Sequence, residues 1–148
     1  DRRQRQMCIR DSPMSVGAAI ASKRKTMVIH GDGGFMFHAT ELATCAQYKV
    51  PLIICVFNDS GYGILRWLQQ NRFGRVNETD LGKVAFAQMA QSMGVPGQRV
   101  ASVEAFAQAM NLAMETNGPY LIDVDMEHFA PMEISLMPKQ KVEVDIRG

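Results

Sequence analysis

Two short segments combine carboxylates with glycines in a way that could bind a metal ion and a phosphate group. The first, Gly31-Asp-Gly-Gly34, follows a short apolar run and places one aspartate among three glycines. The second, Asn58-Asp-Ser-Gly61, follows another apolar run. Glycine permits tight turns and lets a large group approach the backbone closely. Carboxylate oxygens at such turns are suitable ligands for Mg²⁺ or Ca²⁺.

The apolar runs before these turns are predicted to be strands of one sheet. Residues 27–30 form a short apolar run, and residues 51–57 form a continuous β-branched and aromatic run, typical of a strand buried on both faces. Helix-forming residues fill positions 39–48 between them, which gives the content of one βαβ crossover. The ends of neighbouring strands lie about 4.8 Å apart, or about 10 Å with one strand between them. Asp32 and Asp59 could then converge on one cation.

The glycines of the first turn offer a second component of such a site. They would let backbone N–H groups face phosphate oxygens, and Mg²⁺ commonly binds one or two carboxylates together with phosphate and water. The alternative is a tight strand-to-helix turn in which Asp32 caps the next helix. The glycine spacing does not fit the dinucleotide fingerprint G-x-G-x-x-G, and no Gly-Lys-Ser/Thr follows as in a P-loop. Spacing alone leaves both interpretations open.

The rest of the chain continues the alternation of strands and helices. Further helices are predicted over residues 14–22, 64–70, 81–93 and 103–117, and further strands over residues 99–101 and 120–126. Residues 71–80 are polar and are predicted to be a loop. This pattern predicts an α/β domain with a mainly parallel sheet and helices on both faces.

The composition is that of an ordinary globular protein. The 148 residues are 47% hydrophobic and 21% charged, with a net charge of +1, which gives no basis for binding nucleic acid or a membrane surface. No apolar run approaches the ~18 residues needed to cross a membrane, and the polar N-terminus is not a secretory signal. Cys8, Cys45 and Cys55 show no metal-binding spacing. Cys45 and Cys55 lie in apolar segments and are expected to be buried thiols in a reducing, cytoplasmic compartment.

Taken together, the motif residues resemble the thiamine diphosphate motif, in which Gly-Asp-Gly is followed some two dozen residues later by Asn-Asn. Here Gly31-Asp32-Gly33 is followed, after the 24 residues 34–57, by Asn58-Asp59. Flanking residues agree with the C-terminal, diphosphate-binding domain of the acetolactate synthase and decarboxylase group, at positions 13–21, 41–44, 47–48, 50–52 and 61–63. The resemblance covers roughly residues 13–131. The matching residues are specific to the family but do little to distinguish its individual reactions.

The resemblance implies a role for each motif residue, within a thiamine diphosphate-binding fold. Asp32 would bind Mg²⁺ through its carboxylate, Asp59 would do so at the position of the family's second asparagine, and Gly61 would offer its backbone carbonyl. Thiamine diphosphate would lie against these ligands and against Gly31, Gly33, Gly34, Phe35, Asn58, Tyr62, Gly63 and Ile64. The cofactor would supply the chemistry, because its thiazolium ylide adds to a 2-oxo acid, from which CO₂ leaves.

Two departures from the family pattern stand out. The aspartate at position 59 puts a second carboxylate on the metal, which favours the cation and raises the pKa of one carboxylate when the cation is absent. The family's Met-Gly-x-Gly-Leu segment, whose bulky residue supports the bent cofactor, is replaced by residues 8–12. Residues 5–12 instead resemble translated sequencing-adapter sequence. We therefore expect residues 1–12 to be a non-native or disordered leader.

The resemblance also implies which parts of an enzyme this chain does and does not supply. Residues 13–131 would form the diphosphate-binding domain and residues 132–148 a C-terminal tail. In the family, the glutamate that activates the aminopyrimidine lies in a separate N-terminal domain, usually from a second subunit, whereas Glu41 matches a helix position. We therefore expect a fragment of a homo-oligomeric lyase or transferase, with no catalytic residue of its own and an apolar face exposed where partner domains bind.

Three functions are compatible with this resemblance. The nearest is that of the acetolactate synthase large subunit, a carboligase that acts on 2-oxo acids. The second is a decarboxylase of the benzoylformate or phenylpyruvate kind. The third is a non-catalytic module of the same fold that binds Mg²⁺ and phosphate.

Several other residues could be taken for functional residues but are predicted to have structural roles. His30 and His38 flank the first motif and are expected to pack or to form hydrogen bonds, and an exposed loop position is expected for His128. The methionines at helical spacing are predicted to lie in the core, namely Met89, Met93, Met110 and Met114.

Overall fold

The computed structural model describes residues 10–128. The predicted tail, residues 132–148, and Cys8 lie outside the described residues. The first helix already begins at Asp11, so it includes the last two residues of the predicted leader. The elements in chain order are α1 (Asp11–Ser22), β1 (Thr26–Gly31), α2 (Asp32–Met36), α3 (Glu41–Tyr48), β2 (Leu52–Asn58), α4 (Gly63–Phe73), α5 (Phe86–Ser92), β3 (Gly97–Val100), α6 (Val103–Glu115), β4 (Tyr120–Asp125) and the 3-10 helix Met126–His128.

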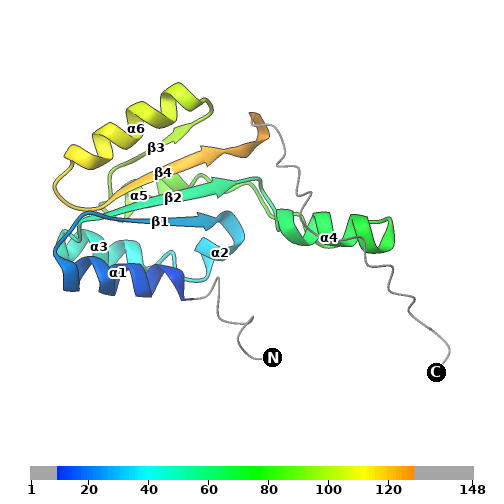
Figure 1. Ribbon diagram of the computed structural model, residues 1–148, viewed down its shortest axis with the longest axis horizontal. Coiled ribbons are helices and arrows are strands. Elements are labelled where there is room, and N and C mark those ends of the chain that lie inside the picture. Colours follow the sequence, from blue (N-terminus) through cyan, green and yellow to red (C-terminus); the bar gives the residue numbers. More distant parts are fainter. Residues whose placement is uncertain (1–9, 129–148) are drawn as a thin grey trace.

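The four strands form one parallel sheet with the order β1-β2-β4-β3. Helices α1, α3 and α5 pack on one face of the sheet, and α6 packs on the other (Figure 1). The predicted α/β class, the parallel sheet and the helices on both faces are confirmed. The connections between parallel neighbours run through helices, as parallel pairing requires.

The apolar sequence of β2 explains its central place. Six of its seven residues are buried, with alternate side chains facing opposite sides of the sheet. Leu52, Ile54 and Val56 join the core under α1, α3 and α5, whereas Ile53 and Cys55 join the core under α6. A strand that must be apolar on both faces reads as a continuous hydrophobic run, which is why the sequence predicted it well.

Element boundaries show where tertiary contacts overrode the local pattern. Helix α5 begins at Phe86 and not at residue 81, because residues 79–81 are held extended by hydrogen bonds to the second turn, Tyr62 N–H to Thr79 O at 2.8 Å and Leu81 N–H to Ser60 O at 2.8 Å. Helix α4 runs three residues into the predicted loop and ends at Gly74, whose φ of 66° suits glycine.

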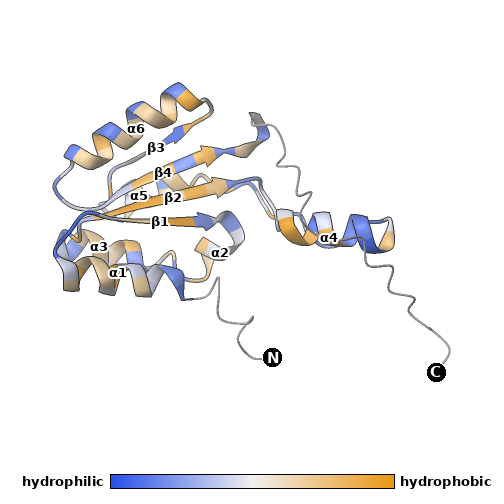
Figure 2. Cartoon of the chain, viewed as in Figure 1, coloured by the Kyte–Doolittle hydropathy of each residue, from blue (hydrophilic) through white to orange (hydrophobic). Residues whose placement is uncertain are grey.

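Helix α4 stands apart from the layered part of the molecule (Figure 1) and has no buried residue. Figure 2 colours parts of α4 as hydrophobic. The exposed apolar side chains of α4 include Ile64, Leu65, Leu68 and Phe73. On β1, Met27 and Ile29 are also exposed. The prediction of an exposed apolar face is therefore met by α4 and by one side of β1. Met114 is 57% exposed, so its predicted place in the core was wrong, whereas Met89, Met93 and Met110 pack against the two cores.

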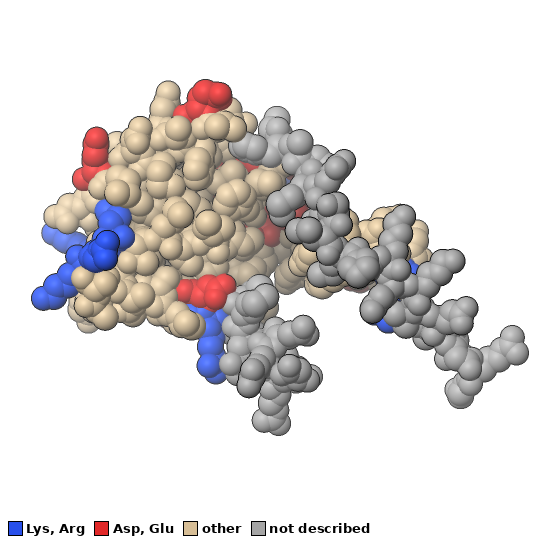
Figure 3. Space-filling model, in the orientation of Figure 1, with Lys and Arg blue, Asp and Glu red and all other residues tan. Residues whose placement is uncertain are grey.

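Charged side chains are few on the described surface that Figure 3 shows. Uncharged side chains cover most of that described face, and Lys and Arg gather at the end opposite α4. This face carries no continuous basic surface of the kind that binds a nucleic-acid backbone. Within residues 10–128, no helix is long and apolar enough to cross a membrane.

The core position of Leu121 on β4 gives a test of this packing. Leu121 is fully buried in the core under α1, α3 and α5, so Leu121→Ala should lower the free energy of unfolding by about 2–5 kcal/mol. Leu112→Ala is the matched control, because Leu112 is 48% exposed and its loss should change stability by less than about 0.5 kcal/mol. Urea denaturation followed by circular dichroism measures both. Equal effects would contradict this core.

The two described cysteines give a second test. Burial raises the pKa of the Cys55 thiol to about 11, and burial together with the charge of Glu41 raises that of Cys45 to about 11. The thiolate is the reactive form, so at pH 8 both thiols should resist iodoacetamide while the chain is folded and react within minutes in urea. Mass spectrometry of a Cys8→Ser variant counts the adducts. Alkylation of either thiol in the folded chain at the rate of a free thiol would refute this.

Candidate functional site

The two predicted turns lie side by side at one edge of the sheet. Strands β1 and β2 are parallel neighbours, with His30 opposite Val56 and Gly31 opposite Phe57. Both strands therefore end at the same edge, and Asp32 and Asp59 follow these two ends. The carboxyl edge of a parallel sheet is where ligands bind in open α/β folds.

The carboxylate of Asp32 joins the first turn to the second. The side chain is buried, with one oxygen, Oδ1, accepting a hydrogen bond from Gly33 N–H at 2.7 Å. The other oxygen, Oδ2, accepts one from Gly61 N–H at 2.9 Å. Gly31, not Asp32, occupies the N-cap position of α2. The interpretation of Asp32 as a simple helix cap is therefore wrong, because half of its hydrogen bonding goes to a segment 29 residues away.

Burial raises the pKa of the Asp32 carboxyl above its usual value. The backbone N–H groups of Gly33 and Gly61 oppose this rise, and the negative charge of Asp59 adds to it. The sequence predicted a raised pKa for one of the two carboxylates. The structure identifies that carboxylate as Asp32 and shows that burial is the larger cause. A cation bound here would offset both the burial and the repulsion.

Asp59 lies beside the first turn of helix α4. A Cβ atom at Gly63 would come within 2.2 Å of Asp59 Oδ2, so only glycine leaves room for this carboxylate. The Arg66 guanidinium lies 3.8 Å from Asp59 Oδ2 and also pairs with Asp80 at 2.9 Å. Arg66 was not among the predicted site residues. The sequence feature that could have identified Arg66 is its position one helical turn after Gly63, which places the two residues on the same side of the helix.

The second turn is held by backbone contacts to the segment before α5. Gly61 forms an antiparallel bridge with Asp80, and a Cβ at Gly61 would meet Thr79 O at 2.8 Å. The preceding residue, Ser60, has a φ of 55°, which is uncommon for a residue with a side chain. A Cβ at Gly33 would lie 2.4 Å from the Tyr62 ring, so the tyrosine packs directly over the first turn.

Asn58 uses its amide inside the protein. It is buried, and its Nδ2 donates to Val84 O and to Asp123 Oδ1, both at 3.1 Å. Its Oδ1 accepts from Ser60 N–H at 3.3 Å. The side chain therefore shapes the turn, and the carboxylate of the next residue, Asp59, stays partly exposed. Asp123 was missed at the sequence level, although a lone aspartate within the apolar run 120–124 was a visible signal.

The remaining predicted residues line this edge in different ways. Phe35 is buried, with its ring 5.6 Å from those of His30 and Phe86, so only its backbone could contact a ligand. Gly34 lies within α2 beside it. Ile64 is 52% exposed on the first turn of α4. The structure thus gathers the predicted residues at the two turns, with the Phe35 side chain directed into the core.

The oxygen atoms at the two turns fit a small divalent cation. Asp32 and Asp59 supply carboxylates, and the Gly61 backbone lies against Asp32. Residues 10–128 contain no cluster of three or more His, Cys, Asp or Glu side chains that could hold a metal. Mg²⁺ does not need such a cluster, because it is usually held by one or two carboxylates and completed by phosphate and water. The donor set therefore suits a cation that is shared with a phosphate-bearing ligand.

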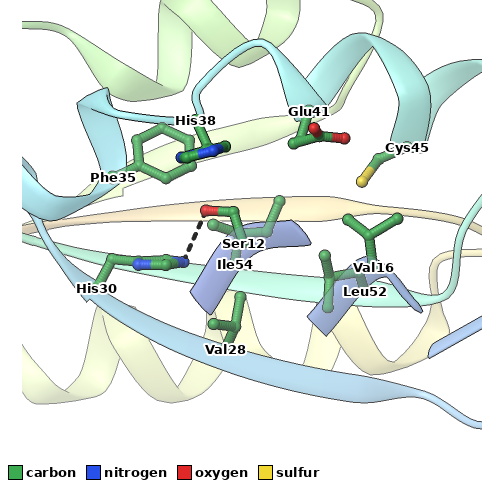
Figure 4. A pocket seen from close by; sticks show the side chains of 10 residues that line it. All are labelled: Ser12, Val16, Val28, His30, Phe35, His38, Glu41, Cys45, Leu52 and Ile54. Carbon is green, nitrogen blue, oxygen red and sulfur yellow. Dashed lines mark hydrogen bonds between the residues drawn. The ribbon is translucent and has the colours of Figure 1, made fainter. Parts of the chain in front are cut away.

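A separate internal cavity involves the histidines and does not resemble a ligand site. It lies between α1, β1 and α3 (Figure 4), and its volume of about 10 Å³ holds at most one water molecule. His30 Nε2 is hydrogen-bonded to Ser12 Oγ at 3.1 Å, and burial lowers the pKa of His30 despite the charge of Asp11. His38 also lines this cavity (Figure 4), and its buried Nδ1 has no hydrogen-bond partner among residues 10–128. For His30, the predicted hydrogen-bonding role is what the structure shows.

Comparisons with known proteins agree on one family. The model of the family described as "Thiamine pyrophosphate enzyme, C-terminal TPP binding domain" matches residues 10–124. The acetolactate synthase of Bacillus subtilis (strain 168) is 33% identical over 117 residues, which are 78% of this chain and 20% of that protein. A probable acetolactate synthase large subunit of Methanocaldococcus jannaschii is 34% identical over 115 residues, which are 76% of this chain and 20% of that protein.

A solved structure gives the same result for the fold. The thiamine diphosphate-dependent 4-hydroxybenzoylformate decarboxylase of Rhodococcus jostii RHA1 is 35% identical with a TM-score of 0.72, over 76% of this chain and 22% of that one. The chain therefore spans about a fifth of the length of the relatives it matches.

The contact between Gly63 and Asp59 gives a test of the cation site. Gly63→Ala should push the Asp59 carboxylate aside while the backbone stays in place, because the atom it meets is the end of a side chain. We expect the affinity for Mn²⁺ in the presence of pyrophosphate to fall about tenfold or more. Water-proton relaxation enhancement measures the bound Mn²⁺.

Gly82→Ala is the matched control, because a Cβ there meets no atom within 4 Å. Its Mn²⁺ affinity should equal that of the unmodified chain. Equal affinities for Gly63→Ala and Gly82→Ala would exclude Asp59 from the cation site.

Proposed function

Because the chain belongs to the family of C-terminal TPP-binding domains of thiamine pyrophosphate enzymes, we propose that its two turns hold Mg²⁺ and, through it, the diphosphate of thiamine diphosphate. Asp32 and Asp59 bind the cation through their carboxylates, and Gly61 binds it through its backbone carbonyl. The observation that carries this proposal is the buried Asp32 carboxylate, hydrogen-bonded to Gly61 and electrostatically coupled to Asp59. A buried carboxylate with a raised pKa gains most from a bound cation.

The backbone around these ligands completes the proposed diphosphate site. Gly31 is exposed, with no atom within 4 Å of a Cβ placed there, whereas Gly33 is buried beneath the Tyr62 ring. Asn58 contributes by shaping the turn, since its amide is engaged within the protein. The diphosphate is proposed to lie against the backbone of Gly31, Gly33, Gly34 and Phe35 on one side and of Asn58, Tyr62, Gly63 and Ile64 on the other.

We infer that residues 13–131 are the diphosphate-binding domain of a larger 2-oxo-acid-processing enzyme. When bound, thiamine diphosphate supplies a nucleophilic thiazolium carbon that adds to a 2-oxo acid and takes up the electron pair when CO₂ leaves. Asp32 and Asp59 would hold the anionic end of the cofactor through Mg²⁺. A second domain, proposed to come from a partner subunit of a homo-oligomer, would supply the glutamate that activates the aminopyrimidine.

The reaction we favour is carboligation of the acetolactate synthase kind, because relatives 33% and 34% identical to this chain carry that name. Decarboxylation is the second candidate, supported by the 35% identity to the 4-hydroxybenzoylformate decarboxylase. The two reactions share the loss of CO₂ and differ in what takes its place, a second carbonyl substrate or a proton. In the enzyme that contains this chain, the product formed from pyruvate, acetolactate or acetaldehyde, distinguishes them.

Binding of thiamine diphosphate should depend on both Mg²⁺ and Asp32. In the presence of Mg²⁺, we expect added thiamine diphosphate to shift the amide resonances of residues 31–35 and 58–64 in ¹H–¹⁵N spectra. Its affinity should be millimolar or tighter. EDTA should remove the shifts, and Asp32→Ala should remove them in Mg²⁺. The NMR measurement is chosen because it detects weak binding, which a site completed by a second domain would show.

Glu115→Ala is the control for the loss of a carboxylate, since Glu115 is exposed at the end of α6. It should bind thiamine diphosphate like the unmodified chain. Shifts that persist in EDTA or in Asp32→Ala would show that the cofactor is not held through a metal at these turns.

A further inference from the structure

Asp123 is a fully buried carboxylate in the middle of an apolar strand. It lies on β4, with an exposed fraction of 0%, between Ile122 and Val124, which pack into the core under α6. A carboxylate at such a position costs folding free energy unless it is well hydrogen-bonded. Its two oxygens accept from two different elements, Oδ1 from Asn58 Nδ2 and Oδ2 from Phe86 N–H, each at 3.1 Å.

The hydrogen bond to Asn58 fixes which way that amide points. Nδ2 of Asn58 faces two oxygen atoms, Asp123 Oδ1 and Val84 O. A flipped amide would place its own oxygen against both, so only one orientation is allowed. In that orientation Oδ1 of Asn58 faces Ser60 N–H and accepts its hydrogen bond at 3.3 Å.

The chain of contacts continues into the proposed cation site. Ser60 holds a left-handed backbone, φ 55°, that the hydrogen bond to Asn58 helps to stabilise. Gly61 follows directly and donates its N–H to Asp32 Oδ2 at 2.9 Å. Asp123 on β4 is thus connected to Gly61 through three links: a hydrogen bond with Asn58, a hydrogen bond from Ser60 to Asn58, and the peptide bond between Ser60 and Gly61.

We propose that Asp123 is a positioning residue for the second turn: by orienting the Asn58 amide, it sets the backbone of residues 58–61 so that Asp59 and the Gly61 carbonyl face Asp32. This rests on the proposed function, because the value of that geometry is the binding of Mg²⁺ and diphosphate. The bond from Phe86 N–H to the same carboxylate has a different role, since it fixes the start of helix α5.

The variant Asp123→Asn separates these two roles. An amide at position 123 can still accept from Phe86 N–H through its oxygen, but its NH₂ group then faces the NH₂ group of Asn58. The backbone link to α5 is retained and the link to the turn is broken. Ile122→Ala is the stability control, because Ile122 is buried on the same strand and packs into the other core.

Amide hydrogen exchange tests the positioning role without any cofactor. In Asp123→Asn, the exchange of Ser60 and Gly61 amides should accelerate about fivefold or more, as expected for a lost hydrogen bond. Exchange of the β4 amides should stay unchanged. In Ile122→Ala the reverse is expected, with faster exchange on β4 and no selective change at Ser60 and Gly61. Unchanged exchange at Ser60 and Gly61 in Asp123→Asn would overturn the proposal.

Mg²⁺ dependence tests whether Asp123 acts through Asn58. The Mg²⁺ concentration for half-maximal thiamine diphosphate binding should rise about tenfold in Asp123→Asn and in Asn58→Ala. The double variant should match Asn58→Ala alone, because the orienting carboxylate has nothing left to orient. Multiplied effects in the double variant would mean an independent action of Asp123 and would overturn the proposal.

The same series separates this proposal from the proposed function. If the unmodified chain shows no Mg²⁺-dependent binding of thiamine diphosphate, the proposed function fails, and hydrogen exchange alone decides whether Asp123 positions the turn. If the unmodified chain binds and Asp123→Asn binds with the same Mg²⁺ dependence, the positioning role is wrong and the function stands.

Discussion

The hydrogen bond between the buried Asp32 carboxylate and Gly61 N–H is the contact on which this site depends. It joins two turns that lie 29 residues apart in the sequence. The bond is possible because β1 and β2 are parallel neighbours in register, so that both turns leave the sheet at the same edge. The apolar sequence of β2, buried on both faces, holds that register in place.

The site concentrates negative charge where folding alone would avoid it. Asp32 is buried with a raised pKa, Asp59 lies close enough to raise it further, and Asp123 is fully buried on the adjoining strand. Each carboxylate is held by N–H donors or by the Arg66 guanidinium. Close, buried carboxylates reduce the stability of the fold unless a cation neutralises their charge. This combination is expected of a functional site.

Three of the glycines at this edge are needed because neighbouring atoms leave no room for a side chain, and not because the backbone adopts a positive φ. Gly33, Gly61 and Gly63 all have ordinary negative φ values, yet a Cβ at each would collide with Tyr62, Thr79 or Asp59. The strained backbone is instead at Ser60, which is held by Asn58. The residues that pack most closely at this edge are therefore also the residues of the proposed site.

The sequence by itself determined the parallel α/β sheet and the location of the two turns, because strand burial and glycine-rich turns are local properties that an apolar run and residue types express directly. It did not determine that Asp32 is hydrogen-bonded to Gly61 or that Asp123 is hydrogen-bonded to Asn58. Those contacts join segments from different strands and helices, and only strand order and register bring them within hydrogen-bond distance. The start of α5 at Phe86 was decided in the same way. Backbone hydrogen bonds hold residues 79–81 against the second turn, and Phe86 N–H donates to a carboxylate 37 residues away.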